Sequence, residues 1–191
     1  MRNRPDTSLG ARRTTDGAVL VDLACGSCGA CADGATLWCR RPLTEGRDLT
    51  PVLPVGRVGE AIDALLGVAA LAEAPADAAV LLLTTPGGPL AVLAATVVAG
   101  RLVVTTDPDE ARAELAGEPT GRAGVVVAGA DARTAVRMVR RGGHVVVAGA
   151  DLPLPSVTEL VQREVTLLAP REVAGTATRI EPRMWAAFAV A

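Results

Sequence analysis

Four cysteines are the residues in this sequence whose type and spacing specify chemistry most clearly. Cys25, Cys28, Cys31 and Cys39 lie within fifteen residues, with the spacing C-x2-C-x2-C-x7-C. Thiolates this close together, in a chain that we expect to be cytosolic, favour a tetrahedral metal site over disulfides. Four protein ligands close the coordination sphere, so we expect a structural Zn²⁺ without an open position. An iron–sulfur cluster and four unligated thiols are the alternatives.

The residues around the cysteines add to this interpretation. The cysteine run follows the apolar segment AVLVDL and precedes polar residues 40–42. In this arrangement it resembles the structural zinc lobe of the medium-chain dehydrogenase/reductase superfamily, the zinc-containing alcohol and polyol dehydrogenases. The resemblance implies a protruding lobe that supports subunit contacts, and it gives the four structural zinc ligands as Cys25, Cys28, Cys31 and Cys39.

The stretch from residue 60 to residue 171 resembles the cofactor domain of the same superfamily. Expected helices alternate with short Val/Leu-rich strands, which is typical of a parallel sheet buried on both faces. The expected elements are a helix at 60–71, a strand at 79–83, a helix at 91–99, strands at 102–106 and 125–127, a helix at 131–139, a strand at 144–147, a helix and strand within 152–170, and a helix from 180.

These patterns predict an α/β fold with two parts. Residues 1–55 are expected to form the structural-zinc lobe and the remnant of a truncated catalytic domain. Residues 56–191 are expected to form a reduced, Rossmann-like nucleotide-binding domain with a parallel sheet. The resemblance also implies that a catalytic barrel, with its own zinc ligands, should precede the lobe by many tens of residues.

A turn rich in glycine and proline follows the first strand of the expected sheet. The superfamily has G-x-G-x-x-G there, whereas this sequence has Thr84, Pro86 and Pro89 at the glycine positions. Gly87 and Gly88 still offer N–H groups at a helix N-terminus, where a phosphate binds. The turn is therefore either a phosphate cradle or a bare structural turn.

An acidic residue, Asp107, ends the second strand, where it would grip a ribose hydroxyl. The alternative role for Asp107 is the N-cap of the following helix. If the resemblance extends to the cofactor, NAD or NADP is held by Thr84, Gly87, Gly88 and Asp107.

The sheet is expected to lack one strand. Seventeen residues separate Asp107 from Val125, too few for the helix, strand and second helix that the resemblance implies. In the order 3-2-1-4-5-6 the third strand lies at the edge, so its loss leaves the core intact.

No catalytic residue can be assigned from the sequence. His144 is the one histidine and opens its strand, at the end opposite to the edge where α/β sheets bind ligands, so we expect a structural or solvated role. Asp131 and Asp151 follow strands and could act as acid and base, or as helix caps and turn residues.

Two further clusters have a functional and a structural interpretation. One expected helix carries arginines 133, 137, 140 and 141. These side chains either contact a phosphate or an acidic partner, or they form a solvated helix face. The expected C-terminal helix carries Met184, Trp185 and Phe188. These side chains either form a docking face for a partner, or pack in the core or on a face that truncation leaves exposed.

Composition excludes several functional classes. The formal net charge of −2 argues against nucleic acid as a partner. Residues 78–100 carry no charge over 23 positions, but residues 84–89 break that run into a strand and a helix, so we expect no membrane span. We therefore expect a cytoplasmic protein.

The function that follows from the resemblance is a zinc-binding, alcohol dehydrogenase-like protein. If it is an enzyme, it is an NAD(P)-dependent oxidoreductase of a small-molecule alcohol, polyol or carbonyl, although no catalytic zinc ligands are recognisable. The alternatives are a non-catalytic zinc-stabilised interaction or accessory protein, and a non-redox enzyme on the same scaffold. We expect a homo-oligomer or pairing with a related subunit.

Overall fold

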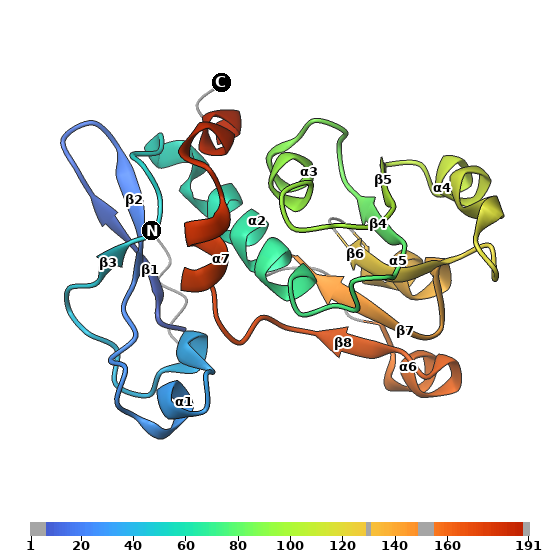
Figure 1. Cartoon of the computed structure of the whole chain (residues 1–191), viewed down its shortest axis with the longest axis horizontal. Helices are drawn as coiled ribbons and strands as arrows, with labels where there is room; N and C mark the ends of the chain where they lie inside the picture. Colours follow the sequence, from blue (N-terminus) through green and yellow to red (C-terminus); the bar gives the residue numbers. More distant parts are fainter. Residues whose placement is uncertain (1–6, 129–130, 149–154, 189–191) are drawn as a thin grey trace.

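A computed structural model of the chain describes residues 7–128, 131–148 and 155–188. A small antiparallel sheet and the cysteine lobe occupy the N-terminal part, to the left in Figure 1. Their elements are β1 (Leu9–Arg13), β2 (Ala18–Asp22), α1 (Gly29–Ala32), the 3-10 turn η1 (Thr36–Trp38) and β3 (Arg47–Asp48).

A five-stranded parallel sheet follows in the chain. Its strands are β4 (Val80–Leu83), β5 (Leu102–Thr105), β6 (Ala123–Ala128), β7 (Val139–Val147) and β8 (Thr166–Leu168). The helices and 3-10 turns are η2 (Val55–Arg57), α2 (Val58–Leu71), α3 (Pro89–Ala94), α4 (Pro108–Glu114), η3 (Leu115–Gly117), α5 (Ala132–Met138), α6 (Val157–Arg163), α7 (Ala174–Arg179) and η4 (Pro182–Phe188).

The strand order of the large sheet is β5-β4-β6-β7-β8, and every neighbouring pair is parallel. In the doubly wound order 3-2-1-4-5-6 this corresponds to 2-1-4-5-6. The predicted loss of the third strand is therefore confirmed, and β5 becomes the edge of the sheet. The predicted α/β class with a reduced Rossmann-type sheet is confirmed as well.

The strands form because their side chains are apolar on both faces. All six residues of β6 are buried, and Leu81 and Leu82 of β4 are completely buried. Their alternate side chains point to opposite faces, so they contribute to two core clusters, one on each side of the sheet. Such burial on both faces requires helices on both sides, as the alternating sequence pattern predicts.

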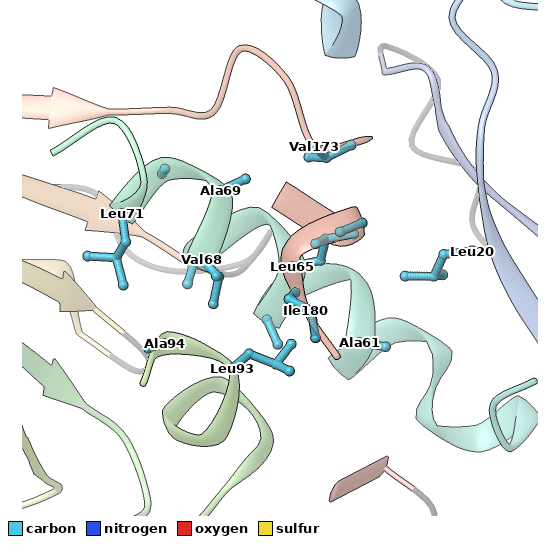
Figure 2. Close-up of a cluster of buried hydrophobic side chains, with 14 of the residues drawn as sticks. Leu20, Ala61, Leu65, Val68, Ala69, Leu71, Leu93, Ala94, Val173 and Ile180 are labelled. Atoms are coloured by element: carbon cyan, nitrogen blue, oxygen red, sulfur yellow. The ribbon is translucent and has the colours of Figure 1, made fainter. Parts of the chain in front are cut away.

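The larger core cluster joins the small sheet to the parallel sheet. Helix α2 lies between the two sheets in Figure 1. Figure 2 shows its buried Leu65 and Val68 packed near Leu93 of α3 and Ile180 after α7, while Leu20 of β2 lies in the same cluster. The two parts thus share one core cluster, and a domain boundary between residues 55 and 56 stays a prediction.

The C-terminal aromatic residues belong to this core. Trp185 is 3% exposed and Phe188 is completely buried, with ring centroids 5.6 Å apart. Of the two interpretations of this cluster, the structure shows core packing for both aromatic rings. The helix expected from residue 180 is present among the described residues as the 3-10 helix η4, over residues 182–188.

Helix α3 is shorter than predicted. The sequence predicts a helix to residue 99, whereas α3 ends at Ala94. The β-branched run Thr96-Val97-Val98 follows, and the hydroxyl of Thr96 donates to the carbonyl of Leu93 at 2.7 Å. This side-chain bond competes with the backbone bonds that would continue the helix. In addition, β-branched residues have a low propensity for helix.

Strand β7 is longer than predicted and corrects the assignment of the arginines. Helix α5 ends at Met138, and Val139 already pairs with Ala123 of β6. Arg140 and Arg141 therefore lie on the strand, not on the helix that carries Arg133 and Arg137. The strand accommodates the extra residues by an irregular register, with Gly142 at φ +70°.

The uncharged stretch from residue 78 to residue 100 folds as β4, a turn and α3, as the sequence predicts. None of the described helices is long and apolar enough to cross a membrane.

Candidate functional site

The lobe brings its four cysteines together by a series of tight turns. Gly26 and Gly34 adopt φ of +73° and +71°, a backbone conformation that glycine adopts without strain. Between them, Cys28 is the N-cap of α1 and Cys31 lies within that helix. Cys39 follows η1 and is buried.

The sulfur positions fit a tetrahedral metal site. The four Sγ atoms all lie within 4.8 Å of one another. The Sγ of Cys28 is 3.5 Å from that of Cys31 and 3.8 Å from that of Cys39. Zn–S bonds of about 2.3 Å in a tetrahedron place sulfurs about 3.8 Å apart, so the donor set and its spacing fit Zn²⁺.

Backbone donors surround the sulfurs. The N–H groups of Cys25 and Arg41 donate to the Sγ of Cys39, at 3.3 and 3.4 Å. The backbone of Ser27 lowers the pKa of the Cys25 thiol to about 6, and the backbone of Cys31 lowers the pKa of Cys28. Burial raises the pKa of Cys31 to about 12. The Cys25 thiol is thus poised as a thiolate at neutral pH, and a bound cation would favour thiolate ligands.

One arginine that the sequence analysis did not identify fastens the lobe to the rest of the molecule. The Arg171 guanidinium donates to the carbonyl of Asp33 at 2.8 Å, and the Arg171 carbonyl accepts from the Leu37 N–H at 3.0 Å. The Arg171 N–H donates to Oε1 of Glu73 at 2.9 Å. No local sequence pattern marks this residue, because its partners lie far away along the chain.

The turn after β4 is the second candidate site. Thr84 directly follows the strand, Gly87 has φ +73°, and Gly88 is the N-cap of α3. The Gly88 N–H already donates to the carbonyl of Thr85 at 3.0 Å. Pro89 occupies the first helical position and has no N–H. Two of the donors that a pyrophosphate would use are therefore spent or missing.

A hollow of about 350 Å³ lies at the carboxyl end of β4. Its lining includes two carboxylates, Glu60 and Asp63, and Glu60 forms an ion pair of 2.9 Å with Arg57. The other lining residues are Ala64, Thr84, Pro89, Leu90 and Ala148. None of these lining side chains carries a positive charge that would neutralise a phosphate. The usual pyrophosphate grip of a dinucleotide is formed by backbone N–H groups at the glycine turn, and the bonded Gly88 N–H and Pro89 do not fit it.

Asp107 acts as a helix cap. Its Oδ1 accepts from the N–H of Asp109 at 2.8 Å at the start of α4, while its own N–H donates to Oγ1 of Thr105 at 3.0 Å. The N-cap alternative is thereby confirmed. The cofactor roles of Thr84, Gly87, Gly88 and Asp107 stay predictions.

Asp131 caps α5 in the same way. Its Oδ1 accepts from the Arg133 N–H at 2.9 Å, and its Oδ2 accepts from the Thr134 hydroxyl at 2.6 Å. The Thr134 hydroxyl is the largest cause that lowers the pKa of this carboxyl. Asp151, its suggested acid–base partner, lies outside the described residues.

His144 lies within β7, opposite Val125 of β6 and Thr166 of β8. The strand continues to Val147 before it reaches the carboxyl edge where α/β sheets bind ligands. The prediction that His144 opens its strand is wrong, because β7 begins at Val139 and His144 is its sixth residue. Its expected separation from the hollow beside β4 holds, since His144 lies level with the first residue of β4.

Comparisons with known proteins identify the fold. No protein-family model matches the sequence, and no curated protein matches it. Among solved structures, the D-arabinose dehydrogenase from Sulfolobus solfataricus matches with a TM-score of 0.57 and 12% identity, over 91% of this chain and 70% of that chain. Acetophenone reductase from Geotrichum candidum NBRC 4597, in complex with NAD, matches with a TM-score of 0.54 and 18% identity, over 92% of this chain and 65% of that chain. An NAD-dependent alcohol dehydrogenase matches with a TM-score of 0.52 and 17% identity, over 89% of this chain and 64% of that chain.

The chain thus spans 64% to 70% of the length of these three enzymes. At such identities the likeness shows the fold, and it confirms the predicted resemblance to medium-chain alcohol dehydrogenases at that level.

Proposed function

We propose that this protein is a zinc-binding, alcohol dehydrogenase-like protein in which Cys25, Cys28, Cys31 and Cys39 hold one structural Zn²⁺. The observation that carries the proposal is the mutual approach of the four Sγ atoms to within 4.8 Å. When bound, Zn²⁺ supplies a cross-link between thiolates. The lobe needs this cross-link, because α1 buries none of its four residues and therefore gains little from apolar packing.

Zinc stoichiometry tests this proposal. Protein purified with zinc present should contain one Zn²⁺ per chain by mass spectrometry of the metal. Cys28→Ala should lower the content well below one, because three thiolates hold the ion less tightly. Ser27→Ala is the matched control, since it changes a neighbour that is not a ligand and should retain the ion. Unchanged zinc in Cys28→Ala would contradict the four-ligand assignment.

For the parallel sheet we propose a non-catalytic, accessory role. The Gly88 N–H is spent within its own turn, Pro89 offers none, and the Asp107 carboxylate caps α4. In addition, the sequence has one histidine, and its four cysteines all lie in the lobe. No His/Cys set for a second, catalytic zinc is left within these 191 residues. A second copy or a related subunit is the expected partner.

An NAD(P)-dependent oxidoreductase is the second candidate function. The hollow of about 350 Å³ at the carboxyl end of β4 favours it, since parallel α/β sheets bind ligands at that end. The cofactor would supply hydride transfer, and the chain would have to position an alcohol, polyol or carbonyl beside it.

Calorimetric titration with NADH and then NADPH, at fixed salt, separates the two functions. We expect no saturable binding up to millimolar cofactor, because the Gly88 N–H is bonded within its own turn, Pro89 has no N–H and the Asp107 carboxylate caps α4. Saturable micromolar binding would overturn the accessory role and would justify a screen of alcohols and polyols.

A further inference from the structure

The free edge of β5 is a second surface with the features of a binding site. Among the described strands β5 pairs with β4 alone, so its other side carries no strand. In Figure 1 β5 lies at the border of the sheet next to α4. An unpaired edge presents a row of backbone N–H and C=O groups that can pair with another extended chain.

The hydrogen bonds to β4 show which groups point outward. The Val80 N–H donates to the carbonyl of Arg101 at 2.9 Å, and the Thr84 N–H donates to the carbonyl of Thr105 at 3.1 Å. The backbone N–H and C=O groups of the odd-numbered residues of β5 therefore point toward β4. Because backbone groups alternate along a strand, the N–H and C=O of Leu102 and Val104 face the open edge.

A groove runs along this edge. It has a volume of about 240 Å³ and is lined by Arg101–Thr105 on one side and by Glu110 and Glu114 of α4 on the other. The hydroxyl of Thr105 donates to Glu110, which fixes that carboxylate at the carboxyl end of the strand. Glu114 lies at the opposite end, 3.6 Å from Arg101.

The charge of this region is strongly acidic. Residues 101–118 contain five carboxylates and two arginines, which gives this strip a formal net charge of −3. The strip is therefore more negative than the whole chain, whose formal net charge is −2. Both arginines are already paired, Arg101 with Glu114 and Glu118, and Arg112 with Asp109. A second copy of the same edge would bring two acidic strips together, so charge favours a basic occupant instead.

The two carboxylates also match the repeat of a strand. Glu110 and Glu114 are one helical turn apart, about 6 Å along the axis. Side chains on one face of a strand repeat at about 6.7 Å. An extended peptide with basic residues at alternate positions would therefore place one cation near each carboxylate while its backbone pairs with Leu102 and Val104.

We propose that the open edge of β5, with the groove between it and α4, is a docking site for an extended basic segment of a partner protein. The segment adds a sixth strand to the sheet, and its alternate Arg or Lys side chains reach Glu110 and Glu114. This inference rests on the accessory role proposed above. Peptide binding and cofactor binding are separate measurements, so either proposal can fail while the other holds.

Binding of a labelled peptide, acetyl-Val-Arg-Val-Arg-Val-amide, to the zinc-replete protein tests the proposal by fluorescence anisotropy. We expect saturable binding that weakens several-fold from low to high salt, because the contacts include exposed charges. The matched peptide with Glu in place of Arg should not bind. No binding of the Arg peptide at low salt, or equal binding of both peptides, would overturn the proposal.

Hydrogen exchange read by NMR distinguishes strand addition from simple attraction of charge. On peptide binding, the amides of Leu102 and Val104 should exchange more slowly. Those of Val103 and Thr105, which face β4, should change little. Binding that leaves Leu102 and Val104 unprotected would overturn strand addition.

Two variants make the site specific. Val104→Pro removes an outward N–H without removing a bond to β4, and should weaken peptide binding about tenfold, the effect of losing one hydrogen bond and introducing a steric block. Glu114→Gln keeps the side-chain shape and should weaken binding a few-fold, which tests the site even if the proline variant fails to fold. Glu181→Gln, at the residue before η4, is the control and should bind normally. Unchanged affinity in Glu114→Gln and in a folded Val104→Pro would overturn the proposal.

Discussion

The cysteine lobe and the parallel sheet achieve order by different means. In the lobe, Cys25, Cys28 and Cys31 are partly exposed, and Leu37 and Cys39 are its buried apolar side chains between residues 25 and 39. In the sheet, all six residues of β6 are buried between two core clusters. The lobe therefore depends on a cross-link among its thiols, whereas the sheet depends on apolar burial.

Removal of zinc should produce the largest effect and should separate the two regions. Zinc contributes about 10–16 kcal/mol of apparent binding free energy in small cysteine-rich domains. After treatment with a chelator, backbone amides between residues 25 and 39 should lose their protection from hydrogen exchange, while those of β6 keep theirs. Mass spectrometry of peptides reads both regions in one experiment. If the lobe stays protected after verified removal of the metal, its order does not depend on the cross-link.

Leu82→Ala should have the converse effect. Leu82 is completely buried in β4, and loss of such a side chain leaves a cavity that lowers the free energy of unfolding by about 2–5 kcal/mol. Urea denaturation measures the change. Leu43→Ala, at a side chain that is 48% exposed, is the control and should change stability by less than about 0.5 kcal/mol. Zinc content should stay at one per chain in both variants, and a loss of zinc in Leu82→Ala would show that the regions are not independent.

Asp131→Ala should cost about 1 kcal/mol, because it removes the N-cap of α5. The folded protein lowers the pKa of this carboxyl, chiefly through the Thr134 hydroxyl. Its contribution is therefore complete above the unfolded pKa of about 3.9 and is lost as the pH falls through the lower folded value. Asp131→Asn keeps a capping oxygen but cannot titrate, so its unfolding free energy should vary less with pH below about 4 than that of the parent. An identical acid profile in parent and Asp131→Asn would contradict this.

Arg141→Gln should have the smallest effect. Arg141 lies 2.6 Å from Glu164, and both side chains are more than half exposed. The ion pair lowers the pKa of Glu164, but water and salt screen such exposed charges. The melting temperature should fall by less than in any variant above, and the difference should vanish in high salt. A large, salt-independent loss would mean that β7 and the end of α6 depend on this contact.

Several features of the protein follow from local sequence patterns. The cysteine spacing identifies the lobe because metal ligands must be close together in space, and here they are close along the chain as well. The Val/Leu runs locate β4, β5 and β6, because strands buried on both faces need apolar side chains throughout. The short interval between Asp107 and Val125 predicts the lost strand, since chain length limits what can be formed.

The tertiary structure decided the features that depend on distant partners. Helix α3 stops at Ala94 and β7 starts at Val139, where side-chain bonding in one case and pairing with β6 in the other override the local pattern. Arg171 fastens the lobe through residues more than 90 positions away. The acidic groove beside β5 exists because the sheet order leaves that strand at the edge while α4 lies next to it. Sequence by itself determined which residues prefer burial, turns or metal, because these are local properties. Only the packed chain determined which of their backbone and charged groups stay unpaired, because that depends on every other element.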